Sequence, residues 1–182
     1  DSGLDYSDYV SFASTDNYHG GSMAGEHLSE LLEGKGNVIL LRLMVGSAST
    51  EAREAGFLDA IAKFDGIRVL SSNQYAGPTR ETAYTAAQNL LQRFGNEVNG
   101  IFTPNESGTN GMLLALRSIG RASKVKFIGF DGGKQNVDAL LSGDLHAIVI
   151  QDPFRMGYLG VKLMVDHLEG LTTQKRFDTG AS

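Results

Sequence analysis

The chain has 182 residues and a net charge of −5, and its 41% hydrophobic and 20% charged residues are ordinary for a globular protein. The negative charge without a Lys/Arg block argues against nucleic acid as a partner, and the absence of a long apolar run argues against membrane insertion. Zero cysteines exclude disulfides and thiolate chemistry.

The first residue is Asp1, and neither an initiator methionine nor a signal peptide precedes the first predicted strand. A new extended segment begins near residue 177, close to the other end. We therefore expect a processed product or a piece excised from a longer protein.

Apolar runs alternate with amphipathic stretches along the chain. In the stretch 18–33, Ala24, Leu28 and Leu31 fall on one helical face, and Asp16 or Asn17 can cap its start. Strands are predicted at residues 9–13, 38–45, 67–71, 100–103, 125–130 and 146–150. Helices are predicted at residues 18–33, 50–64, 80–94, 108–119, 135–141 and 155–168.

This alternation predicts βαβ units, and therefore an α/β fold with a doubly wound parallel sheet. The run 38–45 is apolar at nearly every position, as expected of a strand covered by helices on both faces. In such a sheet the loops that follow the strands build the ligand cleft.

Arg53 lies in the first turn of the helix that follows the strand 38–45. The helix dipole disfavours a cation there by a few tenths of a kcal/mol, so the guanidinium fits better if it reaches a polar ligand or a carboxylate. The alternative is a surface arginine paired with Glu51 or Glu54.

Three further polar residues, Asn105, Asp131 and Gln151, each follow a different predicted strand. Asn105 offers the donors and the acceptor that a hydroxyl pair requires, and Asp131 can accept two charge-assisted hydrogen bonds. The alternatives are a helix cap for Asn105, a cap or turn for Asp131 and a solvent-facing strand end for Gln151. Taken together with Arg53, these planar groups predict a binding site for sugar hydroxyls.

Signals for other chemistries are missing from the sequence. The four histidines are scattered without metal-ligand spacing, so we expect neither a metal nor a cofactor. No nucleophile elbow, P-loop or dinucleotide fingerprint is present, and this disfavours a small α/β enzyme.

An ordered set of motifs resembles the type I periplasmic sugar-binding proteins, the ribose-binding-like components of bacterial ABC transporters. The resemblance covers essentially the whole chain. It is carried by Ser14-Thr15-Asp16-Asn17, Glu51-Ala52-Arg53, Pro104-Asn105-Glu106 and Gly129-Phe130-Asp131-Gly132.

The resemblance implies two lobes joined by three hinge crossings, of which this chain holds only a part. Residues 1–17 are then a remnant of the N-terminal lobe with the first crossing. Residues 18–150 are the C-terminal sugar-binding lobe, and residues 151–182 are the second crossing followed by a helix that belongs to the N-terminal lobe.

The resemblance also implies ligand-binding roles for Asp1, Arg53, Asn105, Asp131 and Gln151. The arginine that often follows the family's N-lobe aspartate is replaced here by Ser2, and Tyr75 is a possible substitute for an absent stacking aromatic. These departures leave the particular sugar open.

The implied function is sugar binding for ABC-transporter uptake without catalysis, with the permease as partner. The implied location is periplasmic or extracellular, with a lipid anchor in a Gram-positive organism. The alternative is the effector-binding core of a lactose-repressor-type transcription regulator. Because the last helix would lack its sheet, we expect Leu159, Leu163, Met164 and Leu168 to form an exposed patch that supports a homodimer or a displaced helix.

Overall fold

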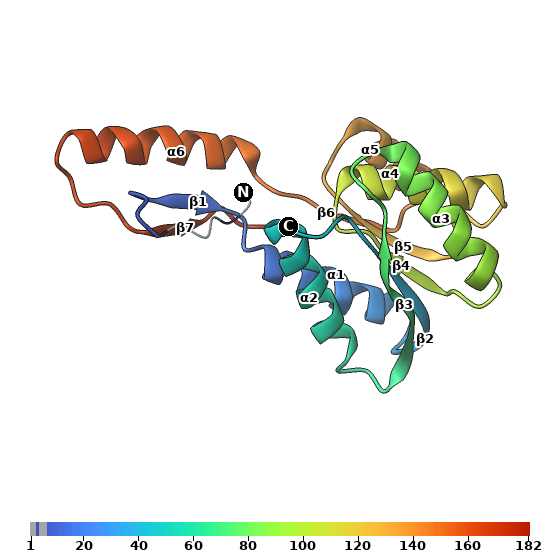
Figure 1. Cartoon of the computed structure of the whole chain (residues 1–182). Helices are drawn as coiled ribbons and strands as arrows, with labels where there is room; N and C mark the ends of the chain where they lie inside the picture. The colour runs from blue at the N-terminus through green and yellow to red at the C-terminus, as the bar shows by residue number, and fades with distance from the viewer. Residues whose placement is uncertain (1–2, 4–6) are drawn as a thin grey trace.

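Two parallel sheets of unequal size organise the chain, shown in Figure 1. The computed structural model describes residue 3 and residues 7–182, so Asp1 and Ser2 lie outside the described residues. The larger sheet has the order β3-β2-β4-β5-β6, and the smaller sheet pairs β1 with β7. The strands are β1 (Phe12–Ser14), β2 (Lys35–Arg42), β3 (Gly66–Tyr75), β4 (Gly100–Phe102), β5 (Lys126–Phe130), β6 (Ala147–Val149) and β7 (Arg176–Asp178).

Six described helices connect the strands, and their ends follow local capping chemistry. The side chain of Asp16 accepts a hydrogen bond from the backbone N–H of His19 at the start of the first helix, as predicted. Gly143 adopts a left-handed φ of 78° and ends the fifth helix. The helices are α1 (Asn17–Leu31), α2 (Ala48–Ile61), α3 (Arg80–Phe94), α4 (Glu106–Ser118), α5 (Lys134–Ser142) and α6 (Pro153–Leu168).

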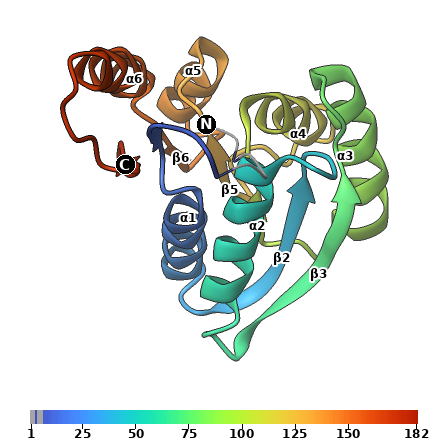
Figure 2. The same cartoon turned by 60° about the vertical axis from the view of Figure 1, so that its left-hand side comes forward.

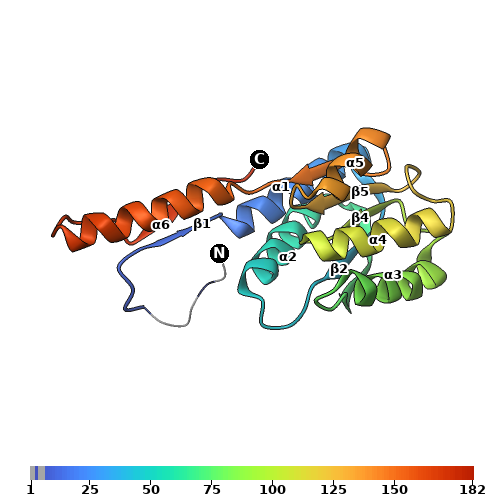
Figure 3. The same cartoon turned by 90° about the horizontal axis from the view of Figure 1, so that it is seen from above.

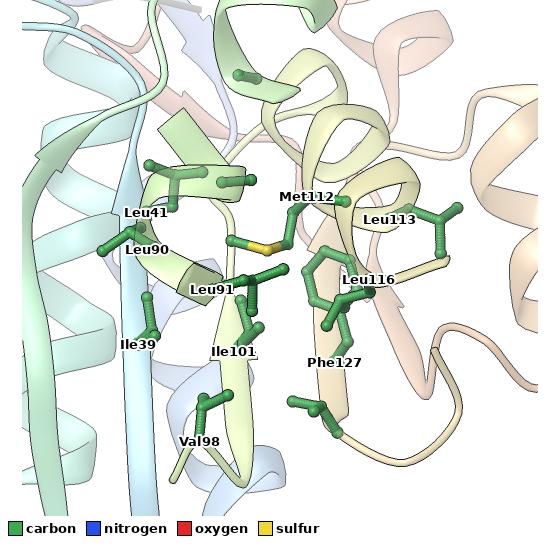
Figure 4. Packing of buried hydrophobic residues seen from close by; sticks show 14 of the residues in the cluster. Ile39, Leu41, Leu90, Leu91, Val98, Ile101, Met112, Leu113, Leu116 and Phe127 are labelled. Atoms are coloured by element: carbon green, nitrogen blue, oxygen red, sulfur yellow. The ribbon is translucent and has the colours of Figure 1, made fainter. Parts of the chain in front are cut away.

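Helices cover both faces of the five-stranded sheet, which confirms the predicted doubly wound α/β class (Figure 2). Val38 and Leu40 of β2 pack with residues of α1 and α2. Ile39 and Leu41, which point the other way, pack with residues of α3 and α4. The second cluster is shown in Figure 4, where Met112 and Leu116 of α4 approach the strands. Because successive side chains of a strand point to opposite faces of the sheet, the apolar strand β2 contributes to two separate hydrophobic cores.

The strand order reverses at β2. The chain leaves β2 for β3 on one side, and later returns to place β4 on the other side, followed outward by β5 and β6. The crevice between the carboxyl ends of β2 and β4 is therefore the topological switch point of this sheet, the place where such folds bind ligands.

The small sheet and α6 form a second layer beside the first. Figure 3, seen from above, shows α6 extending away from the five-stranded sheet, and α6 contacts β1. Three chain segments run side by side between the two layers. Thr179 donates its backbone N–H to the carbonyl of Ser14 at 2.9 Å, and Ile150 and Ser182 exchange backbone hydrogen bonds of 2.8 and 3.1 Å.

Several predicted boundaries are wrong for identifiable reasons. The strand predicted at 38–45 ends at Arg42, since Met44 and Val45 are exposed loop residues despite their apolarity. β3 continues to Tyr75 through polar residues. It can do so because β3 is the edge strand of the sheet, so that one of its sides faces solvent and tolerates polar side chains. The first strand was expected at 9–13 but spans Phe12–Ser14, where β7 is available to pair with it.

The predicted exposed patch on α6 is partly wrong. Leu163 is only 6% exposed, because the small sheet gives α6 partial cover, and Leu159 is half-buried. Met164 and Leu168 are 52% and 77% exposed, as predicted. Helix α6 therefore buries a narrow stripe that contains Leu163 and exposes the rest of its surface to solvent.

Candidate functional site

Arg53 is buried at the switch point, on the first turns of α2. Among the described residues, its side chain forms hydrogen bonds with three that are distant in the chain. Nε donates to Oδ1 of Asn17 at 2.8 Å, one terminal nitrogen donates to the carbonyl of Pro104 at 2.8 Å, and the other donates to Oε1 of Gln151 at 2.9 Å. Arg53 is 3% exposed, so the surface alternative is wrong.

The guanidinium of Arg53 also lies over the ring of Phe130, at 3.8 Å from the ring centroid. Burial lowers the pKa of Arg53 to about 10, and the nearby carboxylate of Asp131 acts against this shift. The group is therefore still a cation at neutral pH. The two glutamates of the alternative are engaged elsewhere, since Glu51 accepts from the backbone of Gly46 and Glu54 faces Arg42.

Gln151 links Arg53 to Asp131. Its Nε2 donates to Oδ1 of Asp131 at 2.6 Å, while its Oε1 accepts from Arg53 and, at 3.2 Å, from the hydroxyl of Thr15. Asp131 has a left-handed φ of 71°, a conformation that non-glycine residues adopt seldom and mostly at turns. Arg53, Gln151 and Asp131 thus form one continuous polar chain, and Gln151 is not a solvent-facing strand end.

Asn105 caps α4, which confirms the capping alternative. Its Oδ1 accepts from the backbone N–H of Gly108 at 3.3 Å, and its Nδ2 donates to the hydroxyl of Ser107 at 2.8 Å. The residue is half-buried and follows Pro104, whose carbonyl binds Arg53. Asn105 therefore neighbours the polar chain through Pro104, while its own side chain bonds to Ser107 and Gly108.

Two open clefts flank this polar chain. The larger, of about 580 Å³, lies at the carboxyl ends of β5 and β6, where Asp131 and Gln151 face Glu106 and the start of α6. The other, of about 420 Å³, lies between the first turn of α2 and the small sheet, beside Thr15 and Asn17. Of the predicted polar residues, Asp131 and Gln151 thus line the larger cleft, whereas Arg53 and Asn105 are not among the described residues that line either one.

Sequence reasoning missed three contributors to the site, Thr15, Asn17 and Phe130. Asn17 was considered as a helix cap and as part of the Ser14-Thr15-Asp16-Asn17 motif, and nothing local marks its contact with Arg53. Thr15 and Asn17 are 3% and 9% exposed in the structure, and this burial of two polar side chains at the start of α1 is visible only once the chain is folded. Asp1 falls outside the described residues, and Tyr75 instead lies beside Arg42 at the end of β3.

Two other kinds of site are absent from the part of the chain that the structure describes. Among those residues, no group of three or more His, Cys, Asp or Glu side chains is arranged to hold a metal ion. Within the same residues, no helix combines the length and the apolarity needed to cross a membrane.

A family profile described as the periplasmic binding protein domain matches residues 1–172. The chain belongs to the periplasmic binding protein family. The ribose import binding protein of Haemophilus influenzae is 35% identical over 163 residues, which are 88% of this chain and 53% of that protein. The D-allose-binding periplasmic protein of Escherichia coli is 33% identical over 156 residues, or 85% of this chain and 50% of its own length.

Solved structures of the family superimpose on the whole of this chain. The periplasmic component of an ABC-type sugar transport system from Hahella chejuensis has a TM-score of 0.94 and 38% identity, with 100% of this chain and 66% of that chain covered. A carbohydrate transporter solute-binding protein from Agrobacterium radiobacter, in complex with D-arabinose, has a TM-score of 0.93 and 32% identity, with coverages of 100% and 63%. The chain spans about half the length of the curated relatives that it matches.

The relatives of this periplasmic binding protein are sugar-binding transport proteins and not enzymes. The relatives named above include no transcription regulator, so the comparisons do not support the regulator alternative.

Proposed function

We propose that this chain is the sugar-recognising part of a solute-binding protein that serves ABC-transporter uptake and catalyses no reaction. The observation that carries the proposal is the hydrogen-bonded chain that leads from Arg53 at the switch point through Gln151 to Asp131, beside the cleft at the carboxyl ends of β5 and β6. The family membership and the sugars in the names of the relatives give the ligand class. A charged planar donor beside a carboxylate is chemistry suited to neighbouring hydroxyl groups.

In this proposal the residues have distinct tasks. Asp131 accepts hydrogen bonds from sugar hydroxyls through its carboxylate. Gln151 orients that carboxylate by donating a hydrogen bond of 2.6 Å to it. Arg53 supplies donors, and Asn105 adds a donor and an acceptor at the adjacent rim. Asp1, which lies outside the described residues, would add a further carboxylate to the set.

The proposed domain organisation follows the two layers. Residues 18–150 would form the sugar-binding lobe, residues 1–17 the remnant of a second lobe with the first crossing, and residues 151–182 the second crossing and α6. The three hydrogen-bonded connecting segments between the layers, of which 150–151 and 181–182 pair in antiparallel fashion, support this division. Closure of the two lobes on a sugar would create the form that a permease recognises.

The proposed location is periplasmic or extracellular, with a lipid anchor if the organism is Gram-positive. It rests on the family and on the periplasmic relatives. The lactose-repressor-type alternative is not proposed, because the relatives named above serve import and carry no hint of regulation in their names.

The proposal is tested by calorimetric titration of the full chain with D-ribose, D-allose and D-arabinose, the sugars of the named relatives. We expect saturable binding of at least one pentose or hexose, and a loss of about ten- to hundredfold in affinity for Asp131→Ala, since hydrogen bonds to charged groups contribute about 1.5–3 kcal/mol.

The matched control is Asp138→Ala on α5, where the carboxylate pairs with Lys134 on the surface. This variant should bind as the unmodified chain does. Equal affinities for all three proteins, or sugar turnover in the same samples, would refute the proposed function.

A further inference from the structure

Asn17 contacts the guanidinium of Arg53 at its Nε atom. It is the first residue of α1 and is 9% exposed. Its Oδ1 accepts from Nε of Arg53 at 2.8 Å, and its Nδ2 donates to the carbonyl of Thr15 at 3.2 Å. Nε of arginine can only donate and a backbone carbonyl can only accept, so these two partners fix which way the amide points.

The guanidinium of Arg53 needs such an edge contact to be held in one orientation. Its stacking on Phe130 at 3.8 Å fixes the plane of the group but leaves rotation within that plane. The hydrogen bonds to Pro104 and Gln151 come from the two terminal nitrogens. The bond to Asn17 is the one at Nε, at the base of the fork, so the three together determine the in-plane angle.

The first turns of α1 are shaped for this task in the backbone as well. A Cβ added to Gly21 would lie 1.9 Å from the carbonyl oxygen of Arg53, and one added to Gly20 would lie 3.3 Å from the edge of the Phe130 ring. Helix α1 therefore approaches both the main chain of Arg53 and the ring beneath its side chain. At Gly21 such close approach is possible only without a side chain, whereas at Gly20 a side chain would press against the Phe130 ring.

We propose that Asn17 is a positioning residue, which fixes the orientation of the Arg53 guanidinium against Pro104 and Gln151 before a ligand arrives. Asn17 acts through Arg53 and does not itself bind the ligand. Orientation in advance lowers the ordering cost of binding, which is how a residue outside the contact set raises affinity. The effect on sugar affinity rests on the proposed function, whereas the orientation of Arg53 does not.

The first measurement needs no sugar. In the ¹⁵N-labelled full chain, the Nε–H resonance of Arg53, assigned by its loss in Arg53→Lys, should exchange slowly with solvent because Nε–H is buried and bonded. Asn17→Ala should speed this exchange by about tenfold or more, as expected when a hydrogen bond to a charged group is lost. Asn17→Asp keeps the acceptor oxygen and should retain slow exchange.

Controls separate orientation from general loss of structure. Asn89→Ala changes an exposed asparagine on α3 and should leave the exchange rate as it is. If Asn17→Ala does not fold, Asn17→Ser, whose hydroxyl is too short to reach Nε, takes its place after its fold is checked by circular dichroism. Unchanged exchange in a folded Asn17→Ala or Asn17→Ser variant would overturn the inference.

The second measurement is titration of the same variants with D-ribose and D-arabinose. Asn17→Ala should weaken affinity by about tenfold, and Asn17→Asp should stay within about threefold of the unmodified chain. Faster Arg53 exchange without any sugar binding by the unmodified chain would overturn the proposed function and support the positioning role. Equal sugar affinity of Asn17→Ala and the unmodified chain would overturn the effect on binding.

Discussion

The two layers of this chain use the same kinds of element and reach opposite degrees of burial. In the five-stranded layer, the side chains of Val38, Leu40 and Phe57 are fully buried. In the layer of β1, β7 and α6, Leu163 is the one buried residue of the helix, and Phe154 is 82% exposed. Two three-residue strands and one helix offer a single face, whereas a sheet with helices on both faces encloses its core.

The largest expected effect comes from removing a phenylalanine from each layer. Phe57→Ala removes a fully buried ring that stacks on Phe102 at 4.6 Å, and should lower the free energy of unfolding by about 3–5 kcal/mol. Phe154→Ala should change it by less than about 0.5 kcal/mol, since the side chain is already exposed to water. Urea unfolding followed by circular dichroism measures both, and equal losses would break the comparison.

The same glycine-to-alanine change should have opposite signs in the two layers. Gly21→Ala places its methyl group 1.9 Å from the backbone oxygen of Arg53 and should destabilise the fold by about 1–3 kcal/mol or more. Gly157→Ala in α6 meets nothing within 4 Å and should stabilise by about 0.5–1 kcal/mol through helix propensity. Thermal unfolding of both variants measures the two changes in stability. An unchanged stability of Gly21→Ala would mean that α1 and α2 separate easily.

The open surface of α6 should cause self-association, as the homodimer hypothesis states. Replacing Leu168 by serine should weaken association by about 2 kcal/mol, since a buried apolar side chain contributes about that much. Light scattering over a concentration series measures this. Leu141→Ser on α5 is the matched control, because Leu141 is 82% exposed in the other layer. If the unmodified chain and every variant remain monomeric at all concentrations, the homodimer hypothesis is wrong.

The smallest expected effect is a pH dependence inside the five-stranded layer. Burial, with a smaller contribution from Lys126, lowers the pKa of His146, whose Nδ1 accepts from the backbone N–H of Phe127 at 3.3 Å. The unfolded chain then binds a proton more readily than the folded one, so stability is present above pH 6.5 and is lost as the pH falls through the lower folded pKa.

His146→Asn keeps an acceptor near the position of Nδ1 but cannot titrate. Its free energy of unfolding should therefore decline less steeply below pH 6.5 than that of the unmodified chain. Urea unfolding at a series of pH values measures the two slopes. Identical slopes would show that His146 is not the group responsible.

Local chemistry made some elements predictable and left others ambiguous. Helix α3 spans Arg80–Phe94 as predicted, because Thr79 forms a capping box with Thr82 and a strong apolar face follows. The end of β2 was misjudged, since Met44 and Val45 are apolar residues of an exposed loop. Apolarity reports a preference for burial, and only the surrounding helices decide whether that preference is met.

The sequence by itself determined the alternation of strands and helices, and with it the fact that Arg53, Asn105, Asp131 and Gln151 follow strand ends. Only the tertiary structure decided which of them touch. Arg53 binds partners that are 36, 51 and 98 residues away in the chain. Those contacts exist because the strand order β3-β2-β4-β5-β6 and the hydrogen-bonded connecting segments bring distant loops to one edge, and no local pattern encodes that order.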